Sequence, residues 1–301
     1  MIQKIIIILL SIALSCFAYA DSLPIDLDTE IEQVPEFPIE VDALEEFIQS
    51  YYTLLESDEY LKSFKFLQTE RNTIQNAAGG LNSFFYKLLE LRSGLRDQVT
   101  IFQIGDSHIK PGFFSTTARS ALLKYFGVNY TGSSPTLQYQ FLAVNGGSFQ
   151  NLLANDAIFN RCRELAPDLV VISLGTNDAQ GNYNAARFRK ELQAFMGKLE
   201  LFQGQADILF TLPPDTNKRG KHNADVAKVS EEIMDYARDK GYAWWNLAEV
   251  MGGKSSIGKW RAQDFASKDL IHFSPKGYML QGHLFYHALM KGYKNFTEGG
   301  G

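Results

Sequence analysis

The sequence predicts an α/β fold in which a parallel β-sheet is covered by helices on both faces. Two observations carry this prediction. Short apolar runs typical of buried strands alternate along the chain with amphipathic segments of helical period, an order that requires crossover connections between parallel strands. One run, residues 168–174 (D-L-V-V-I-S-L), is apolar almost throughout, which is typical of a strand buried on both faces.

The first twenty residues predict an export signal rather than part of the fold. A positive start at Lys4 precedes an apolar run too short to span a membrane, and Ala18-Tyr19-Ala20 has the small residues of a cleavage site. We therefore expect residues 1–20 to be a signal peptide cleaved after Ala20, and the protein to be periplasmic or secreted rather than transmembrane. A lipid anchor on Cys16 is the alternative, but the preceding residues match a lipidation signal poorly.

The segment after the signal peptide is acidic. Residues 21–41 contain three prolines and no lasting periodicity, and predict a linker. Residues 42–95 contain two apolar runs at helical spacing and predict a helical extension that packs on the main domain. The 13 acidic residues between Asp21 and Leu61 leave 28 basic against 21 acidic residues in the rest of the mature chain. That remainder attracts anionic polymers mildly, but it lacks the Lys/Arg stripe of a nucleic-acid-binding protein.

The alternation begins at Val99, and we place the main domain at residues 96–295. The predicted strands are residues 99–105, 138–144, 168–174, 207–212 and 243–247. The predicted helices are residues 114–126, 151–164, 188–202, 223–240 and 275–291, the last of them opened by a Ser-Pro pair that favours a helix start. Residues 296–301 are Gly-rich and predict a flexible tail. Cleavage leaves Cys162 as the single cysteine, so no internal disulfide is expected.

Three of the predicted strands end in turns that combine glycine with polar side chains. They are Gly105-Asp106-Ser107-His108, Asn145-Gly146-Gly147 and Gly175-Thr176-Asn177-Asp178. A fourth polar segment, Asp269-Leu270-Ile271-His272, lies in the loop before the last helix. Because the carboxyl ends of parallel strands meet at one edge of a sheet, these segments can converge there.

The residue types in these segments suit acyl transfer. A serine hydroxyl becomes a useful nucleophile when a base takes its proton, and His272 is the candidate base for Ser107. Asp269 can accept the other ring N–H of the histidine, which fixes its tautomer and stabilises the imidazolium. The backbone N–H groups of Ser107 and Gly146, with the amide of Asn177, can form an oxyanion hole.

The four segments, in this order, resemble the four blocks of the SGNH (GDSL-type) hydrolase family over about residues 96–295. The resemblance implies that Ser107, Gly146, Asn177 and His272 hold the four name-giving positions, and that Asp269 completes the triad. It also implies a flavodoxin-like three-layer α/β/α sandwich with a central parallel sheet of about five strands. The activity implied is that of a serine esterase, and we expect no metal and no other cofactor.

Further residues narrow the resemblance to the exported peptidoglycan O-acetylesterase branch of the family. The nucleophile block ends in His108 rather than leucine, and similar blocks stand at residues 211–215 and 269–278. That branch removes acetyl from the 6-hydroxyl of N-acetylmuramic acid. Some of its members carry a carbohydrate-binding module between the nucleophile and glycine blocks. The roughly forty residues between Ser107 and Gly146 leave no room for one here.

Several residues keep more than one interpretation at this point. Gly147 is an alternative to Gly146 as an oxyanion donor, because glycines and asparagines also simply make turns. His108 either lines the substrate pocket or orients the loop, and Trp260 is the candidate for stacking on a sugar. A basic loop is either solvated or meets carboxylates of a wall polymer; it contains Lys218, Arg219, Lys221 and His222.

A metal site is not expected. His283 and His287 have a spacing that could hold a metal, but no glutamate follows the first histidine as it does in zinc proteases. The preferred function is therefore a metal-independent esterase that deacetylates a cell-wall glycan. Rival functions are an O-acetyltransferase or another carbohydrate acetylesterase with the same site, and a non-catalytic glycan-binding envelope protein. The complete triad argues against the last of these.

Overall fold

The computed structural model describes residues 58–127 and 136–299. These residues all belong to one compact unit. The predicted signal peptide, the predicted linker and the first part of the predicted extension lie outside the described residues. Within the described ranges, none of the helices has the length and apolar character that crossing a bilayer requires.

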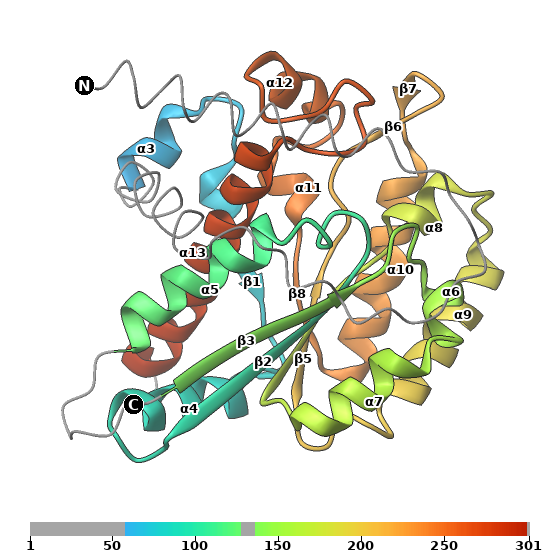
Figure 1. The fold of residues 1–301 in the computed structure, drawn as a ribbon. Coiled ribbons are helices and arrows are strands. Elements are labelled where there is room, and N and C mark those ends of the chain that lie inside the picture. Colours follow the sequence, from blue (N-terminus) through green and yellow to red (C-terminus); the bar gives the residue numbers. More distant parts are fainter. Residues whose placement is uncertain (1–57, 128–135, 300–301) are drawn as a thin grey trace, which may run out of the picture. The chain divides into compact units, whose positions relative to one another are not determined.

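A six-stranded sheet forms the centre of the described unit, in the spatial order β1-β8-β5-β4-β2-β3 (Figure 1). The strands are β1 (Ile74–Gln75), β2 (Gln98–Gly105), β3 (Thr136–Ala143), β4 (Leu169–Ser173), β5 (Asp207–Thr211) and β8 (Ala243–Trp245). All neighbouring pairs are parallel except β1 with β8. The predicted sheet of about five parallel strands is therefore confirmed, and β1 adds a sixth, antiparallel strand.

The order of the five parallel strands places a reversal of the winding between β2 and β4. If β2, β3, β4, β5 and β8 are numbered 1 to 5 in chain order, they lie side by side in the order 2-1-3-4-5. This is the flavodoxin-like arrangement predicted from the family resemblance. Ligands in such sheets bind where the winding reverses, outside the carboxyl ends of the strands. Gly105 at the end of β2 pairs with Ser173 at the end of β4, so the two strands end level at this point.

Helices cover both faces of the sheet and give the three layers (Figure 1). One apolar core lies between the sheet and the helices α4 (Asn82–Arg92), α5 (Phe113–Phe126) and α13 (Pro275–Gly299). The other core lies beneath α6 (Phe149–Leu153), α7 (Asp156–Leu165), α9 (Ala185–Leu199) and α10 (Asp225–Lys240). The strand β4 is buried along its whole length, as its apolar sequence predicts.

Short elements complete the described unit, and several of them carry or support polar segments at the carboxyl edge of the sheet. They are α3 (Asp58–Ser63), the 3₁₀ turn η1 (Thr69–Arg71), α8 (Thr176–Gln180), the hairpin of β6 (Asn217–Lys218) and β7 (Lys221–His222), α11 (Leu247–Val250) and α12 (Ser256–Ala262). The helix α8 follows β4 directly, and the hairpin follows β5.

The described part of the predicted extension belongs to the same core as the sheet. Phe84, Phe85 and Leu88 of α4 are buried with side chains of α13 and α5. The N-terminus of α4 is also bound to the sheet, because Phe84 N–H donates to the carboxylate of Asp207 at 2.7 Å. Residues 58–95 therefore supply α4, which packs on the same face of the sheet as α5 and α13, and the strand β1.

Several predicted helices differ from the structure. The helix predicted for residues 151–164 is divided into α6 and α7, and the one predicted for residues 188–202 lies three residues earlier, at Ala185–Leu199. The helix predicted from Asn223 begins at Asp225, and the Asn223 side chain accepts a hydrogen bond from Asp225 N–H at 3.1 Å just before it. The last helix runs to Gly299, well beyond the predicted end near Lys291, so residues 296–299 are helical rather than a flexible tail. Tyr293, in the added turns, is buried against Phe85 and Phe126, which explains why the helix continues.

Replacing Gly282 with alanine should destabilise the protein, because α13 approaches α5 closely at this residue. A Cβ on Gly282 would lie 2.4 Å from the Phe114 carbonyl oxygen, so the two helices would have to separate. We expect a loss of about 1–3 kcal/mol in the free energy of unfolding, measured by urea titration.

The matched control is Gly197→Ala, in the last turn of α9, where an added Cβ meets no atom within 4 Å. That variant should gain about 0.5–1 kcal/mol, since alanine favours a helix more than glycine does. Equal effects of the two substitutions would contradict the close packing of α13 on α5.

Candidate active site

Ser107 lies in the turn that follows β2, at the point where the winding of the sheet reverses. The backbone must bend sharply there, and Gly105 permits it because a Cβ would lie 2.4 Å from Cβ of Ile109. The turn is closed by the Asp106 carbonyl, which accepts hydrogen bonds from Ile109 N–H and Lys110 N–H. Ser107 is half-buried as a result, with its hydroxyl directed toward the loop before α13.

The structure brings together the three residues predicted to form the triad. Ser107 Oγ lies 3.0 Å from His272 Nε2, and His272 Nδ1 lies 2.7 Å from Asp269 Oδ2. With its proton on Nδ1, the imidazole donates to Asp269 and accepts from the serine hydroxyl. These are the distances at which a base can take the serine proton.

Asp269 is held as a carboxylate that faces the histidine. Its Oδ1 accepts hydrogen bonds from Ile271 N–H at 2.9 Å and from His272 N–H at 3.0 Å. Partial burial alone would raise the pKa of Asp269, but the hydrogen bonds from the His272 ring and from these backbone groups lower it below its usual value. The side chains of His272 and Asp269 are nevertheless 40% and 45% exposed, so this side of the site is open to solvent.

Two of the predicted oxyanion donors, Ser107 and Gly146, lie in the turns after β2 and β3, and the third, Asn177, lies in α8 directly after β4. The N–H groups of Ser107 and Gly146 donate to no other backbone group among the described residues. The N–H of Gly147 donates to the Val144 carbonyl at 2.9 Å, so it is used in closing the turn. Asn177 Nδ2 donates to the Gly147 carbonyl at 2.9 Å and to Asp106 Oδ2 at 3.2 Å, which ties the turns together.

Two aspartates beside the oxyanion donors have raised pKa values. Burial raises the pKa of Asp106 to about 7, although hydrogen bonds from His108 N–H and Asn177 lower it in part. Burial also raises the pKa of Asp178 to about 7, against the hydrogen bond from Phe149 N–H. The two carboxyls are close enough for the charge on Asp178 to raise the pKa of Asp106 further.

His108 is buried beneath the candidate base, and it also lines a small hollow of about 20 Å³ together with Asp106 and Ile109. Its ring stacks on that of His272 with 5.1 Å between centroids and 26° between planes, and it is 7% exposed. Tyr278 Oη lies 3.4 Å from His108 Nδ1. Burial, with a smaller effect of the neighbouring His272, lowers the pKa of His108 to about 3, which keeps this imidazole neutral.

The prediction that Trp260 stacks on a sugar is wrong. The side chain is fully buried in α12 and packs against Phe66, Phe265 and Phe273. Its indole N–H donates to the Met251 carbonyl at 3.1 Å, so both the ring and its polar atom are used inside the protein. The residue fixes the loop before α13 from within.

His283 and His287 lie side by side on α13, with their Nε2 atoms 3.1 Å apart in a hydrogen bond. Among the described residues no third His, Cys, Asp or Glu joins a group that could hold a metal ion. The pair therefore contributes a hydrogen bond to the packing of α13, and the candidate site is built without it.

A chain of buried polar side chains crosses the sheet near the candidate site, and the sequence analysis missed it. Gln103 Oε1 accepts from Tyr139 Oη at 2.9 Å and from Ser115 Oγ at 2.6 Å, and its Nε2 donates to Ser173 Oγ at 2.8 Å. Thr211 Oγ1 then donates to Ser173 Oγ at 2.7 Å. Glutamine in the middle of an otherwise apolar strand is the sequence signal of such a chain, because a buried amide needs partners.

A cavity of about 120 Å³ opens beside Asn177 and Asp178. Its other lining residues are Ser148, Gln150, Gly181, Tyr183, Asn184, Arg187, Phe188 and Glu191. Hydroxyl, amide and charged groups predominate, which suits a polar ligand better than an alkyl chain.

The family follows from a match over the segments just described. The model of the GDSL-like lipase/acylhydrolase family matches residues 104–280, which include all four polar segments. The chain belongs to this family. As a GDSL-like family member it is a carboxylic ester hydrolase, and the resemblance to SGNH hydrolases inferred from the sequence is confirmed.

Solved structures with the same fold include esterases that act on acetylated glycans. A peptidoglycan O-acetylesterase structure aligns with a TM-score of 0.65 at 17% identity, covering 74% of this chain and 99% of that one. A two-domain esterase active on acetylated mannans aligns with a TM-score of 0.53 at 16% identity, covering 75% of this chain and 56% of that one. At these identities the likeness is one of fold. No curated protein sequence matches this chain.

Replacing Asp178 with asparagine should make stability less dependent on pH. A buried carboxyl with a raised pKa binds a proton in the folded state that it releases in the unfolded state between about pH 4 and 7, so folding stability falls as pH rises through this range. Asparagine keeps the acceptor for Phe149 N–H and does not titrate. We expect the variant to gain up to about 1.4 kcal/mol per pH unit relative to the unsubstituted protein.

The measurement is the free energy of unfolding by urea at pH 5, 6 and 7 for both proteins. Asp106 stays in place in the variant, so part of the pH dependence should remain. Parallel profiles would show that Asp178 keeps an ordinary pKa.

Proposed function

We propose that this protein is an exported serine esterase that removes O-acetyl groups from a cell-wall glycan, with the 6-O-acetyl of N-acetylmuramic acid in peptidoglycan as its first substrate. The observation that carries the proposal is the hydrogen-bonded series of Ser107, His272 and Asp269 at the reversal point of the sheet. The side chains of His272 and Asp269 are partly exposed to solvent, where a polymer can reach them.

The reaction proceeds through an acetyl-enzyme. His272 Nε2 takes the proton of Ser107 as the serine oxygen attacks the acetyl carbonyl, and Asp269 stabilises the imidazolium that forms. The tetrahedral intermediate collapses when the imidazolium returns its proton to the leaving sugar oxygen. A water molecule, deprotonated by His272, then attacks the acetyl-enzyme. This step releases acetate and restores the serine hydroxyl.

The oxyanion is stabilised by groups held in two turns and in the short helix α8. Ser107 N–H and Gly146 N–H donate without having to break a backbone hydrogen bond. Asn177 contributes the N–H that it otherwise gives to Asp106 at 3.2 Å, the longer of its two contacts. Gly147, whose N–H closes its own turn, is not needed as a donor.

Three features support a glycan acetate rather than a lipid ester. His272 and Asp269 are partly exposed, the cavity beside Asn177 is mainly polar, and the chain after residue 61 carries more basic than acidic residues. The likeness of fold to a peptidoglycan O-acetylesterase and to an esterase active on acetylated mannans points the same way. Residues 1–20 support export to a compartment where such a polymer lies.

The mature protein should release acetate from O-acetylated peptidoglycan, measured as acetate formed with time. Xylan acetate and a long-chain 4-nitrophenyl ester serve as competing substrates and should be hydrolysed more slowly. Ser107→Ala should lower the rate of acetate release by about 10³-fold or more, because no other described hydroxyl has His272 as its base.

The same variant should keep its thermal unfolding midpoint, which shows that the loss is chemical. Undiminished activity in Ser107→Ala would refute the assignment of the nucleophile. Preference for xylan acetate would mean that the natural substrate is a glycan other than peptidoglycan. Transfer of acetyl to an added sugar faster than to water would make the protein a transferase.

His108 should act on catalysis through the stacked ring of His272 rather than by contacting substrate. Replacing it with phenylalanine keeps an aromatic ring under His272, whereas leucine removes the stack. With 4-nitrophenyl acetate we expect His108→Leu to lose about tenfold in kcat with little change in KM. Without the stacked ring, His272 spends less time in the orientation from which it takes the serine proton. His108→Phe should retain most of the activity.

Steady-state kinetics at several pH values provides the measurement. A rise in KM with unchanged kcat in both variants would instead mean that His108 contacts the substrate.

A further inference from the structure

The hairpin of β6 and β7 lies between two parts of the candidate site that are distant in sequence. Its two-residue turn, Arg219-Gly220, has positive φ at both residues, which is the geometry of a tight hairpin. From the sequence, its basic residues are expected either to be solvated or to meet carboxylates of a wall polymer. Of its four basic residues, Arg219 and Lys221 are exposed, whereas His222 Nδ1 lies 3.0 Å from Asp215 Oδ1 and Lys218 turns inward.

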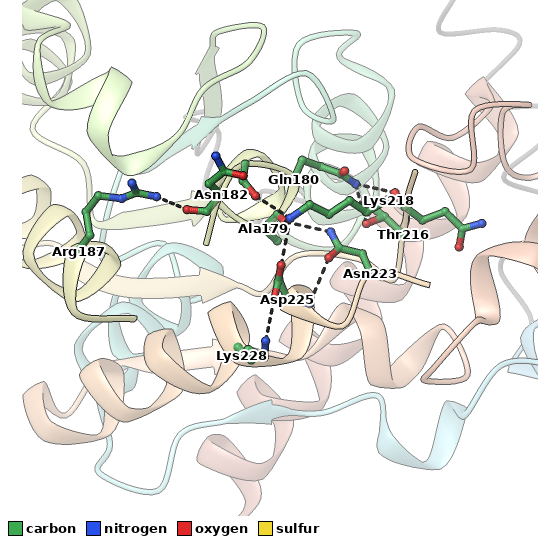
Figure 2. Close-up of polar contacts among 11 residues, drawn as sticks. Ala179, Gln180, Asn182, Arg187, Thr216, Lys218, Asn223, Asp225 and Lys228 are labelled. Atoms are coloured by element: carbon green, nitrogen blue, oxygen red, sulfur yellow. Dashed lines mark hydrogen bonds and ion pairs between the residues drawn. The ribbon is translucent and has the colours of Figure 1, made fainter. Parts of the chain in front are cut away.

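Lys218 binds the carboxyl end of α8, the short helix that carries Asn177 (Figure 2). Its ammonium donates to the Ala179 carbonyl at 2.9 Å, to the Gly181 carbonyl at 2.6 Å and to Asp225 Oδ2 at 3.0 Å. An ammonium group has three N–H donors, and all three are used. Carbonyls at a helix C-terminus lack partners within the helix and carry partial negative charge, so a cation suits them.

Two further side chains join α8 to the same hairpin (Figure 2). Gln180, the last residue of α8, donates from Nε2 to Thr216 Oγ1 at 3.1 Å and to the Asn217 carbonyl at 2.8 Å. Asn223, just after the hairpin, donates from Nδ2 to the Ala179 carbonyl at 3.2 Å. A helix of five residues has little stability of its own, so these contacts fix its position.

The other side of the hairpin holds the loop of the candidate base. Asn217 N–H donates to the Leu270 carbonyl at 2.8 Å, and Leu270 lies between Asp269 and His272. Leu270 has φ of 56°, a conformation that side-chain-bearing residues adopt only when the surroundings enforce it. Asn217 thus accepts from α8 through its carbonyl and donates to the histidine loop through its N–H.

We propose that the β6–β7 hairpin is the positioning element that sets Asn177 relative to His272, and that Lys218 is the positioning residue through which it holds α8. The inference rests on the oxyanion role proposed for Asn177, and not on the identity of the glycan. Lys218 touches no reacting atom. It acts by keeping the end of α8 fixed, so that the Asn177 amide meets the developing oxyanion without reorganisation.

Lys218→Met is the direct test, assayed with 4-nitrophenyl acetate as a small neutral ester. Loss of the helix contacts should lower kcat on the order of tenfold, because displacement of an oxyanion donor weakens stabilisation of the transition state, with KM changed less than twofold. Lys218→Arg keeps a cation with several N–H donors and should recover part of the rate. Lys221→Met, on the facing position of the same hairpin, removes an exposed lysine and should leave both constants unchanged.

A double-mutant cycle with Asn177→Ala distinguishes positioning of Asn177 from a general loss of structure. If Lys218 acts through Asn177, Lys218→Met should cost almost nothing further when Asn177 is already alanine. Additive losses would overturn the proposal, and so would an Asn177→Ala variant with unchanged kcat. An increase in KM for peptidoglycan alone, with normal hydrolysis of the small ester, would also overturn it and make Lys218 a substrate-binding residue.

Gln180→Met provides a second test if Lys218→Met does not fold. It removes the links from α8 to Thr216 and Asn217 without leaving a buried charge unpaired, and it should lower kcat in the same non-additive manner. A normal kcat in this variant would contradict the proposal. Because the substrate is a small ester, failure to deacetylate peptidoglycan would count against the proposed function and leave this result standing.

Discussion

The parallel pairing of β2 with β4 is the constraint on which the candidate site depends. Gly105 and Ser173 are paired at the ends of these strands, so the turns that follow begin at the same level of the sheet edge. One turn presents Ser107, and the other leads into α8 with Asn177. The reversal of winding at this pair sends the two following helices to opposite faces of the sheet. The space between the turns therefore stays open to a ligand.

Much of the fold and most of the candidate site could be predicted because their signals are local. A run such as residues 169–173 indicates a buried strand by itself, and the Gly-Asp-Ser turn carries its own bend at Gly105. Strand β1 could not be predicted, since two residues have no periodicity and gain their conformation from pairing with Trp244 and Trp245.

Side-chain environments were predicted less well, because they depend on residues far away in sequence. Trp260 was expected to be accessible in a long loop, but Phe66, from a distant part of the chain, closes over it together with Phe265 and Phe273. Lys218 looked like part of a solvated basic loop, whereas its acceptors include carbonyls almost forty residues earlier. Charge pattern alone does not reveal a lysine folded onto a helix end. His108 was noticed as unusual, but its place under His272 required the fold.

The short strand β1 covers one edge of the sheet and limits its pairing with other chains. Strand β8 is only three residues long and would otherwise form one border of the sheet, with a row of backbone N–H and C=O groups open to pairing with another chain. Residues 74–75 occupy that row in the antiparallel sense, and two residues offer little length for further pairing. A chain shortened to the matched residues 104–280 would lose this cover and most of β2, and would expose strand edges that are open to pairing with another chain.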